Sequence, residues 1–249
     1  MRKFLTAALL VWILITVFIV VRRLHLPEGV GMFIVFVTMA AMGIWAAKQQ
    51  VIADRLRLQQ TAAKFGFKPV EPGEVEISIE PLRGPGWVQG AACGELRGLK
   101  TWIFDYDIRD SGRDTKSIRQ TVVAFRADEA NLPIFLIRPL GMNSSIGDSQ
   151  NTDDSVCFPD ALHFHRRFEL VSSAEEGVRR HFDAKLLDTI ASLNEWNYCV
   201  QGYYTTVLFF APKKAILKPD AMEAFARKGA DIAYAIFSTE KRVLAAAAE

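Results

Sequence analysis

The chain has 249 residues, of which 50% are hydrophobic and 23% charged, and its formal net charge is +2. This near-neutral balance and a pI of about 8.4 argue against an electrostatic nucleic-acid binder, which concentrates Lys and Arg in one stripe. The cysteines Cys93, Cys157 and Cys199 are odd in number and lack CxxC spacing. We therefore expect a reducing compartment and no disulfide framework.

Two uncharged apolar runs occupy residues 4–21 and 29–47. At about 1.5 Å per residue, a helix of either length crosses the roughly 30 Å hydrocarbon layer of a membrane. The second run is the less hydrophobic of the two. Its small residues, however, stand at helical spacing and would let a neighbouring helix approach closely. The sequence therefore predicts a transmembrane hairpin over residues 1–47.

The basic residues around these runs bear on processing and on orientation. Arg22 and Arg23 follow the first run where a small-residue cleavage site would stand, so we expect no cleaved signal peptide. More basic residues flank the side that holds both termini: Arg2, Lys3, Lys48, Arg55, Arg57 and Lys64. Because basic flanks resist translocation, this bias predicts that both termini are cytoplasmic.

Residues 48–68 are expected to continue helically out of the membrane as a stalk or linker, with Gly66 as the C-cap. Two interpretations are open for this segment. Arg55 and Arg57 would contact anionic lipid headgroups, or the stalk would dock on the following domain. We favour docking.

Residues 69–249 form one soluble domain, a size that suits a single buried core. Short runs rich in Val, Ile, Phe, Tyr and Trp predict antiparallel strands at residues 87–96, 101–108, 121–126, 133–138 and 163–171. Two more are expected between 197 and 211, on either side of Gly202. Within residues 101–108, Trp102, Phe104 and Tyr106 share one face. The opposite face carries Asp105 and Asp107, so its outer part is expected to be solvated.

Two helices complete the expected domain. In residues 174–193 an apolar stripe recurs at a 3.6-residue period: Val178, Phe182, Leu186, Ile190 and Leu193. A last helix opens at Pro219 and buries one side through Met222, Phe225, Ala226, Ile232 and Ile236. Strands grouped in this way with helices predict an α+β domain, in which helices pack on one face of a mainly antiparallel sheet.

A metal or hydrolytic site would need convergent His and carboxylate groups. The nearest set is Asp153, Asp154 and Asp160 with His163 and His165. If His163 and His165 stand on a strand, their i, i+2 spacing turns both imidazoles to one side, where they could reach one ion. The spacing matches no dedicated metal signature. Loop acids beside a solvated strand are the simpler interpretation, and we assign no metal ligand.

Three other candidates are weaker. Asp105 and Asp107 could form an acid/base pair, although a solvated strand face explains them more simply. Cys157 could be a nucleophile served by His163 or His165, but a lone Cys is more often a small hydrophobe. The polar loop at residues 110–117 lacks the GxxxxGK[ST] spacing of a phosphate-binding loop. We therefore assign no catalytic residue and no cofactor.

The domain resembles an uncharacterised group of bacterial membrane proteins. The resemblance is carried by Phe104-Asp-Tyr-Asp107, Ser111-Gly112, Gln120-Thr-Val122, Leu132-Pro133 and Glu175-Glu-Gly-Val-Arg179. It implies two N-terminal spans followed by one cytoplasmic domain in the bacterial inner membrane, and it supplies no active site.

The leading functional hypothesis is a multi-pass inner-membrane protein whose cytoplasmic domain binds a protein or lipid-derived partner without catalysis. The alternative is a membrane-tethered hydrolase or metal-dependent enzyme that uses residues 153–165. A transporter subunit is disfavoured, because neither apolar run carries an ionisable residue to mark a substrate path.

Overall fold

The structure is a computed structural model that describes residues 16, 19, 28–64, 66–75, 86–109, 117–141, 155–194, 198–212, 214–216 and 218–247. The chain divides into two compact units, Met1–Asp54 and Arg55–Glu249. The first predicted membrane run, residues 4–21, lies outside the described residues apart from Thr16 and Ile19, which are helical.

The helix α2, Glu28–Ala63, contains the second apolar run and continues without a break beyond it. Its segment Val30–Ala63 is, among the described residues, the one helix long and apolar enough to cross a membrane. Large apolar side chains on it are exposed: Met32 by 75%, Phe33 by 67% and Phe36 by 69%. Such exposure is typical of a helix that requires an apolar environment.

The last two turns of α2 belong to the second unit and pack into its core. Leu58 and Ala62 are buried in the main apolar cluster, as expected for a segment docked on the domain. The Arg55 guanidinium donates to Glu71 Oε2 at 2.6 Å. Gly66 has a φ of +88°, a left-handed conformation that glycine adopts without strain, and its N–H donates to Ala63 O at 3.1 Å. The predicted C-cap at Gly66 is therefore confirmed.

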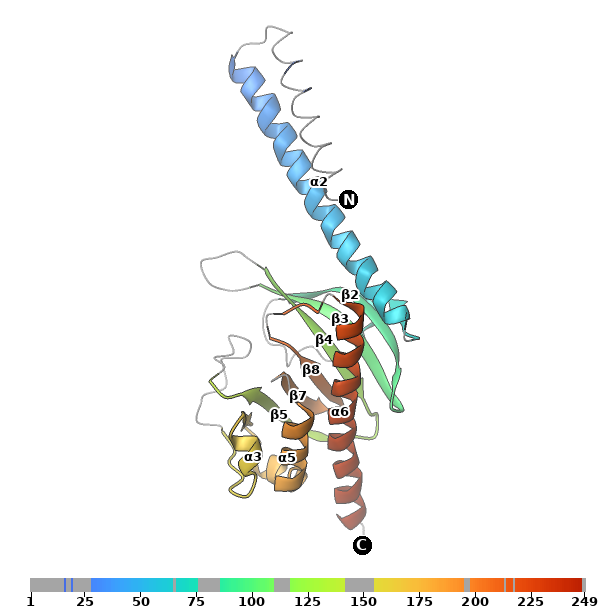
Figure 1. Ribbon diagram of the computed structural model, residues 1–249, viewed down its shortest axis with the longest axis vertical. Helices are drawn as coiled ribbons and strands as arrows, with labels where there is room; N and C mark the ends of the chain where they lie inside the picture. Colours follow the sequence, from blue (N-terminus) through green and yellow to red (C-terminus); the bar gives the residue numbers. More distant parts are fainter. Residues whose placement is uncertain are drawn as a thin grey trace. The chain divides into compact units, whose positions relative to one another are not determined.

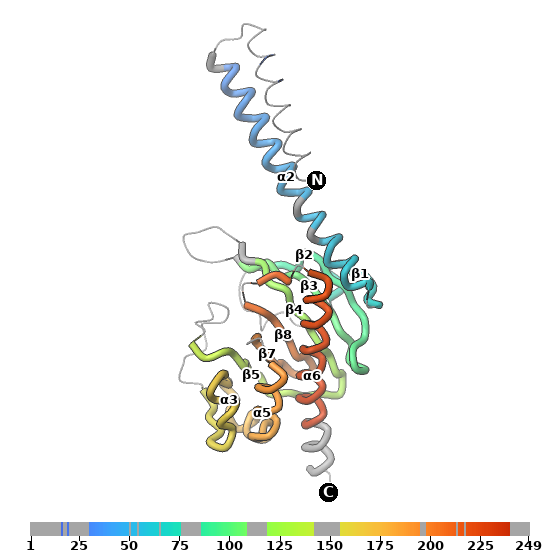
Figure 2. The backbone as a smooth tube through the Cα atoms, viewed as in Figure 1, coloured from blue at the N-terminus to red at the C-terminus, as the bar shows by residue number. Residues whose placement is uncertain are grey.

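The described part of the domain contains one antiparallel sheet of eight strands in the order β1-β2-β3-β4-β8-β7-β5-β6 (Figure 1). The strands are β1 Lys68–Val70, β2 Gly86–Leu96, β3 Leu99–Arg109, β4 Ser117–Arg126, β5 Leu132–Pro139, β6 Phe168–Val171, β7 Cys199–Tyr204 and β8 Thr206–Phe210. A short 3-10 turn, η1 Pro72–Glu74, follows β1, which lies beside β2 at one edge of the sheet (Figure 2).

Four helices follow: α3 Leu162–His165, α4 Glu175–His181, α5 Ala184–Leu193 and α6 Pro219–Ala247. Figure 1 shows α6 running along the sheet, with α5 beside α6 and α3 beside α5. The predicted buried face of α6 is confirmed, since Met222, Phe225, Ala226, Ile232 and Ile236 are all buried. The α+β class and the mainly antiparallel sheet are likewise as predicted.

Both faces of the sheet carry buried apolar side chains. The larger cluster joins α3–α6 and the end of α2 to strand residues such as Ile103, Val123 and Phe209. A second cluster on the opposite face contains Trp102 and Phe104 together with Val122, Leu208 and Phe210. The central strands are therefore buried on both sides.

Three local predictions are wrong. Residues 162–165 form the short helix α3 rather than the start of a strand; its Phe164 is buried, and the Phe164 N–H donates to Asp188 Oδ1 on α5 at 2.9 Å. The predicted helix at 174–193 is two helices, since Asp183 stops α4 and caps α5 by accepting the Leu186 N–H at 2.6 Å.

The third concerns Gly202, which lies inside β7 rather than at the turn to β8. It faces Phe135 directly across the β5–β7 pair. A Cβ on Gly202 would stand 2.0 Å from the Phe135 ring, so the ring occupies the space above this glycine. Phe135 also packs edge-on against Phe182, with ring centroids 4.7 Å apart, so it cannot easily move aside.

We expect Gly202→Ala to destabilise the protein by about 1–3 kcal/mol through overpacking. Gly73→Ala is the matched control, because nothing lies within 4 Å of a Cβ at that position. Thermal unfolding of the full-length protein in detergent measures the change in stability of each variant. Equal midpoints for the two variants would contradict the packing seen at Gly202.

Candidate functional site

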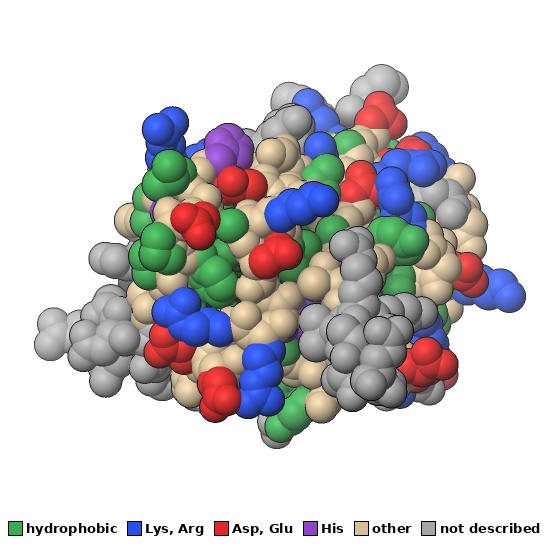
Figure 3. Space-filling model, turned by 90° about the horizontal axis from the view of Figure 1, so that it is seen from below, with side chains coloured by type: hydrophobic (Ala, Val, Ile, Leu, Met, Phe, Trp, Pro, Cys, Tyr) green, Lys and Arg blue, Asp and Glu red, His purple; other side chains and the backbone are tan. Residues whose placement is uncertain are grey.

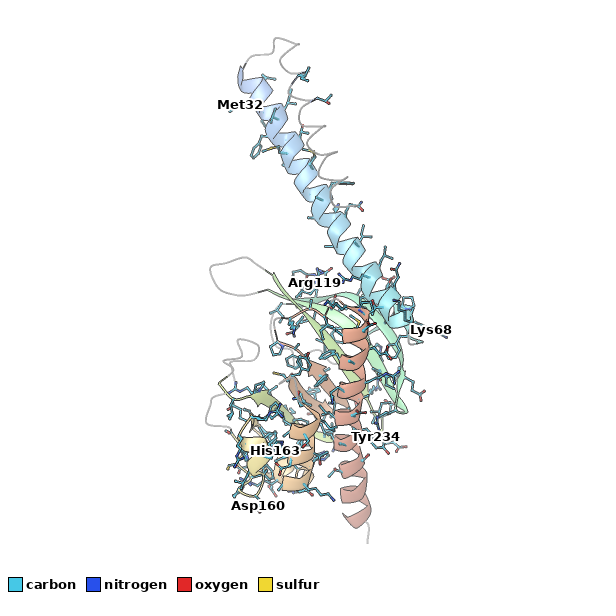
Figure 4. The ribbon with its side chains drawn as sticks, viewed as in Figure 1. Met32, Lys68, Arg119, Asp160, His163 and Tyr234 are labelled. Carbon is cyan, nitrogen blue, oxygen red and sulfur yellow. The ribbon has the colours of Figure 1, made fainter. Side chains whose placement is uncertain are left out.

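The predicted histidine pair does not converge in the structure. His163 and His165 stand on α3, where positions two apart point about 200° from one another. His163 and Asp160 are exposed, and Figure 4 labels both near α3. Asp153 and Asp154 lie outside the described residues. Among the residues that are described, no group of three His, Cys, Asp or Glu side chains could hold a metal ion.

Cys157, the candidate nucleophile, is exposed. The Phe158 N–H donates to His165 Nε2 at 3.0 Å, so this ring nitrogen already accepts a hydrogen bond and is not placed to take a thiol proton. Elsewhere, burial raises the pKa of the Cys199 thiol to about 12, although the charge of Arg138 lowers it. Cys199 therefore remains a thiol at neutral pH.

Asp105 and Asp107 do share one face of β3, but the prediction that this face is solvated is wrong. Asp105 is 6% exposed and Asp107 is 3% exposed. The chain that covers them includes the segment after β8, since Thr121 exchanges hydrogen bonds with residues 214 and 216. Because these residues are so distant in the chain, the local sequence pattern cannot predict that they bury this face.

Each buried carboxylate has its own donors. Thr121 Oγ1 donates to Asp105 Oδ1 at 2.7 Å and itself accepts the Ile216 N–H at 2.8 Å. Asp107 Oδ1 accepts from Arg119 Nε, and Asp107 Oδ2 from Gln89 Nε2, both at 2.9 Å. Because the two groups are satisfied separately, the arrangement is typical of a structural polar cluster rather than an acid/base pair.

A cavity of about 510 Å³ lies at the other end of these strands and is the candidate functional site. It is lined by the β2–β3 turn, by the β4–β5 connection and by α6 through Tyr234, Phe237 and Ser238. Figure 4 labels Tyr234 beside this end of the sheet and Arg119 at the opposite end. Its volume falls within the range of about 300–1,000 Å³ common for small-molecule sites.

The lining combines an apolar wall with basic side chains. Leu99 and Phe237 are buried apolar residues of the wall. Arg97, Lys100 and Arg126 supply the basic groups, and each already has a partner. Arg97 Nε lies 2.5 Å from Asp231 Oδ1, and Arg126 Nε lies 2.5 Å from Asp128 Oδ1. Lys100 Nζ stands 4.8 Å from the centroid of the Trp102 ring, a cation–π distance.

The charges around this end of the domain are mixed. Asp128 and Glu129 line the cavity together with the basic residues. Figure 3 views the domain from below and shows basic and acidic side chains interspersed, with apolar patches between them. The described lining contains neither His nor Cys. This chemistry is suited to binding a small ligand rather than to nucleophilic or metal catalysis.

No protein-family model matches the chain, and no curated protein matches it. A solved structure, that of the mycobacterial trehalose monomycolate transport factor A, TtfA, is 14% identical to the chain. The match covers 72% of this chain and 93% of TtfA, with a TM-score of 0.45. A similarity at this level carries no inference about function.

Sequence reasoning missed the cavity, because its residues come from three separated segments. One signal was available: Arg97-Gly98 stands between Leu96 and Leu99 as a two-residue hairpin turn, which would have placed Lys100 near that turn. No sequence signal pairs Lys100 with Arg126 before the strand register is known.

His181 is a second group that the sequence did not single out. It ends α4, is 5% exposed, and packs edge-on against Phe182. Its Nε2 has no hydrogen-bond partner among the described residues. Burial lowers the pKa of His181, and a backbone hydrogen bond with Ile236 partly raises it again. The imidazole is therefore held neutral inside the domain.

The buried ion pair gives a stability prediction. Arg119→Met should destabilise the domain by about 3–5 kcal/mol, because it leaves the Asp107 carboxylate buried without its cation. The double variant Asp107→Asn/Arg119→Met should recover part of this loss. Arg227→Met, which breaks an exposed pair with Glu223, is the control and should change stability by less than about 1 kcal/mol. Equal unfolding midpoints for Arg119→Met and Arg227→Met would show that burial of the pair does not matter.

The neutral His181 gives a pH prediction. Its pKa is lower in the folded state than the unfolded value of about 6.5, so the unfolded state binds the proton more readily. The contribution of His181 to stability is therefore complete above about pH 6.5 and is lost as the pH falls from there toward the folded pKa. Melting midpoints measured between pH 8 and pH 5 should fall more for the wild type than for His181→Gln. If the melting midpoints of the two proteins fell equally with pH, the lowered pKa of His181 would be refuted.

Proposed function

We propose that this chain is a bacterial inner-membrane protein in which an N-terminal hairpin anchors a cytoplasmic, non-catalytic binding domain. The partner is a protein or a lipid-derived molecule. The observation that carries the proposal is the exposed apolar stretch of α2. The resemblance to two-span bacterial membrane proteins supports the same layout.

The energetics of α2 favour a bilayer over water. On the insertion scale each Leu, Ile, Phe or Val contributes about −0.3 to −0.6 kcal/mol at the helix centre. Phe33, Phe36 and Val37 are among the exposed residues of this type. Without a membrane these side chains would present a continuous apolar surface to water, which soluble proteins avoid.

The binding role is supported by the cavity at the β2–β3 turn. It joins a buried apolar wall to a few charged groups of both signs, a lining common in small-ligand pockets. The catalytic alternative at residues 153–165 has less support, because His163 and His165 point apart on α3 and His165 Nε2 already accepts a hydrogen bond. Binding is therefore the function we propose.

Reporters fused after Glu249 test the topology. Green fluorescent protein should fluoresce, and alkaline phosphatase, which needs periplasmic disulfides, should be inactive. In the variant Phe36→Arg/Ala40→Arg, two charges at about 2.5–3.5 kcal/mol each should prevent the second span from inserting. The first span would then carry the domain to the periplasm, and the two reporters should exchange their signals.

Gln60→Arg, on an exposed position at the end of α2, is the control and should leave both reporters unchanged. Active phosphatase on the wild-type chain would contradict the cytoplasmic assignment. Recovery of the wild-type chain in the soluble fraction would contradict anchoring itself.

A further inference from the structure

We propose that the end of the domain at which β2 begins binds the surface of an anionic phospholipid bilayer. The inference rests on the proposed membrane anchor and adds a second contact with the same bilayer. It is carried by five exposed residues at this end, which we call the Trp87 surface: Leu56, Arg57, Trp87, Lys214 and Lys218.

The strand register places distant parts of the chain side by side near this end. Gly90 of β2 lies opposite Asp105 of β3, and Asp105 lies opposite Thr121 of β4. The Thr121 N–H donates to the Lys214 carbonyl at 3.1 Å. One row across the sheet therefore leads from β2 to the segment that carries Lys214. Lys218 follows four residues later, immediately before α6 begins.

Trp87 stands beyond this row, at the start of β2. It lies opposite Asp107, which lies opposite Arg119, and Figure 4 labels Arg119 at this end of the sheet. Because neighbouring strands are about 4.8 Å apart, Trp87 and Arg119 lie roughly 10 Å from one another. Asp107 is buried, yet Trp87 is 42% exposed. An exposed Trp, with an apolar ring and a polar N–H, suits the interface between membrane and water.

The chain enters the domain near the same end. Arg55 is the first residue of the second unit, and a Cβ on Gly90 would stand 3.0 Å from its side chain. Farther along the chain, Phe67 lies in the same way against Gly94. The segment from Arg55 to Phe67 therefore runs away from the start of β2. Leu56, which follows Arg55 and is exposed, lies at the part of this segment nearest to that start.

The length of chain before Arg55 limits how far the domain can lie from the bilayer. Arg55 is seven residues after Lys48, which follows the second apolar run. Even fully extended, seven residues span at most about 25 Å. The proposed anchor therefore keeps the entry point of the domain within this distance of the headgroups. A weak contact is then sufficient, because a tethered surface meets the bilayer at a high effective concentration.

The cations of the Trp87 surface are available to lipid phosphate groups. Arg57, Lys214 and Lys218 are exposed, and none of them forms an ion pair with a residue that the structure describes. Two exposed acids stand near them. Glu74 accepts a backbone N–H at the start of η1, and Asp220 lies in the first turn of α6, at the positive end of the helix dipole. The cations outnumber these acids, and anionic headgroups attract them over about 8 Å at physiological salt.

Lysine labelling of the full-length chain in nanodiscs tests the contact. An amine-reactive ester, with mass spectrometry as the readout, should label Lys214 and Lys218 at least threefold more slowly in nanodiscs that contain phosphatidylglycerol than in phosphatidylcholine alone. Lys185, exposed on α5, is the control and should be labelled equally in both. High salt should remove the difference, because it screens the attraction. Equal labelling rates for Lys214 and Lys218 in the two membranes would overturn the proposal.

Trp87 gives an independent readout. Its fluorescence, taken as the difference between the wild type and Trp87→Phe, should be quenched by brominated phospholipid at least twofold more when phosphatidylglycerol is present. Lys214→Gln/Lys218→Gln should abolish this dependence on phosphatidylglycerol. Arg180→Gln/Arg227→Gln removes the same charge at exposed positions outside the Trp87 surface and should preserve it. Equal quenching in the two double variants would overturn the assignment of the surface.

Further outcomes separate this proposal from its alternatives. If polyglutamate, added to phosphatidylcholine nanodiscs, protected the two lysines while phosphatidylglycerol did not, the surface would belong to an acidic protein partner and the bilayer contact would be wrong. Equal labelling in both membranes leaves the reporter topology intact. A periplasmic reporter would contradict the cytoplasmic assignment but leave the labelling result intact, because both leaflets of a nanodisc carry the same lipids. The two proposals therefore fail separately.

Discussion

Burial of both faces of β3 and β4 constrains the rest of the domain. Trp102 and Phe104 pack on one face of β3, and Ile103 packs on the other under the helices. A polar side chain in such strands has no access to water, so it must find a partner inside the protein. Asp105 and Asp107 therefore lie where Thr121 and Arg119 can satisfy them. A shifted alignment would separate Asp105 from Thr121 and Asp107 from Arg119, and breaking a buried ion pair costs about 3–5 kcal/mol.

The same register determines the opposite end of the two strands. The alignment that places Asp107 opposite Arg119 also places Lys100 opposite Arg126. Lys100 lies seven residues before Asp107 on β3, and Arg126 lies seven residues after Arg119 on β4. A slip of one residue would relieve this repulsion, but it would turn every buried side chain to the wrong face. The like-charge pair at the cavity is thus a consequence of the acid–base pairing in the interior. It is accommodated there because Glu95 on β2 stands directly opposite Lys100, and the Arg126 guanidinium pairs with Asp128.

The sequence predicts those features that depend on local spacing. Trp102, Phe104 and Tyr106 alternate along a strand, and the apolar face of α6 recurs at a helical period, so both were predictable. The burial of Asp105 was not, because its cover comes from residues some hundred positions later in the chain. A local signal was also available for the break in the predicted helix at 174–193. Asp183 has the chemistry of an N-cap, which favours a helix start at that position.

The end of α2, from Arg55 onward, contributes to the stability of the domain. Leu58 and Ala62 lie in the main core, and Phe67, just beyond the helix, fills the space above Gly94. Burial of a Leu or Phe side chain contributes about 1.5–3 kcal/mol, a substantial part of the stability of a typical domain. The helix end is therefore a structural part of the domain rather than a flexible tether.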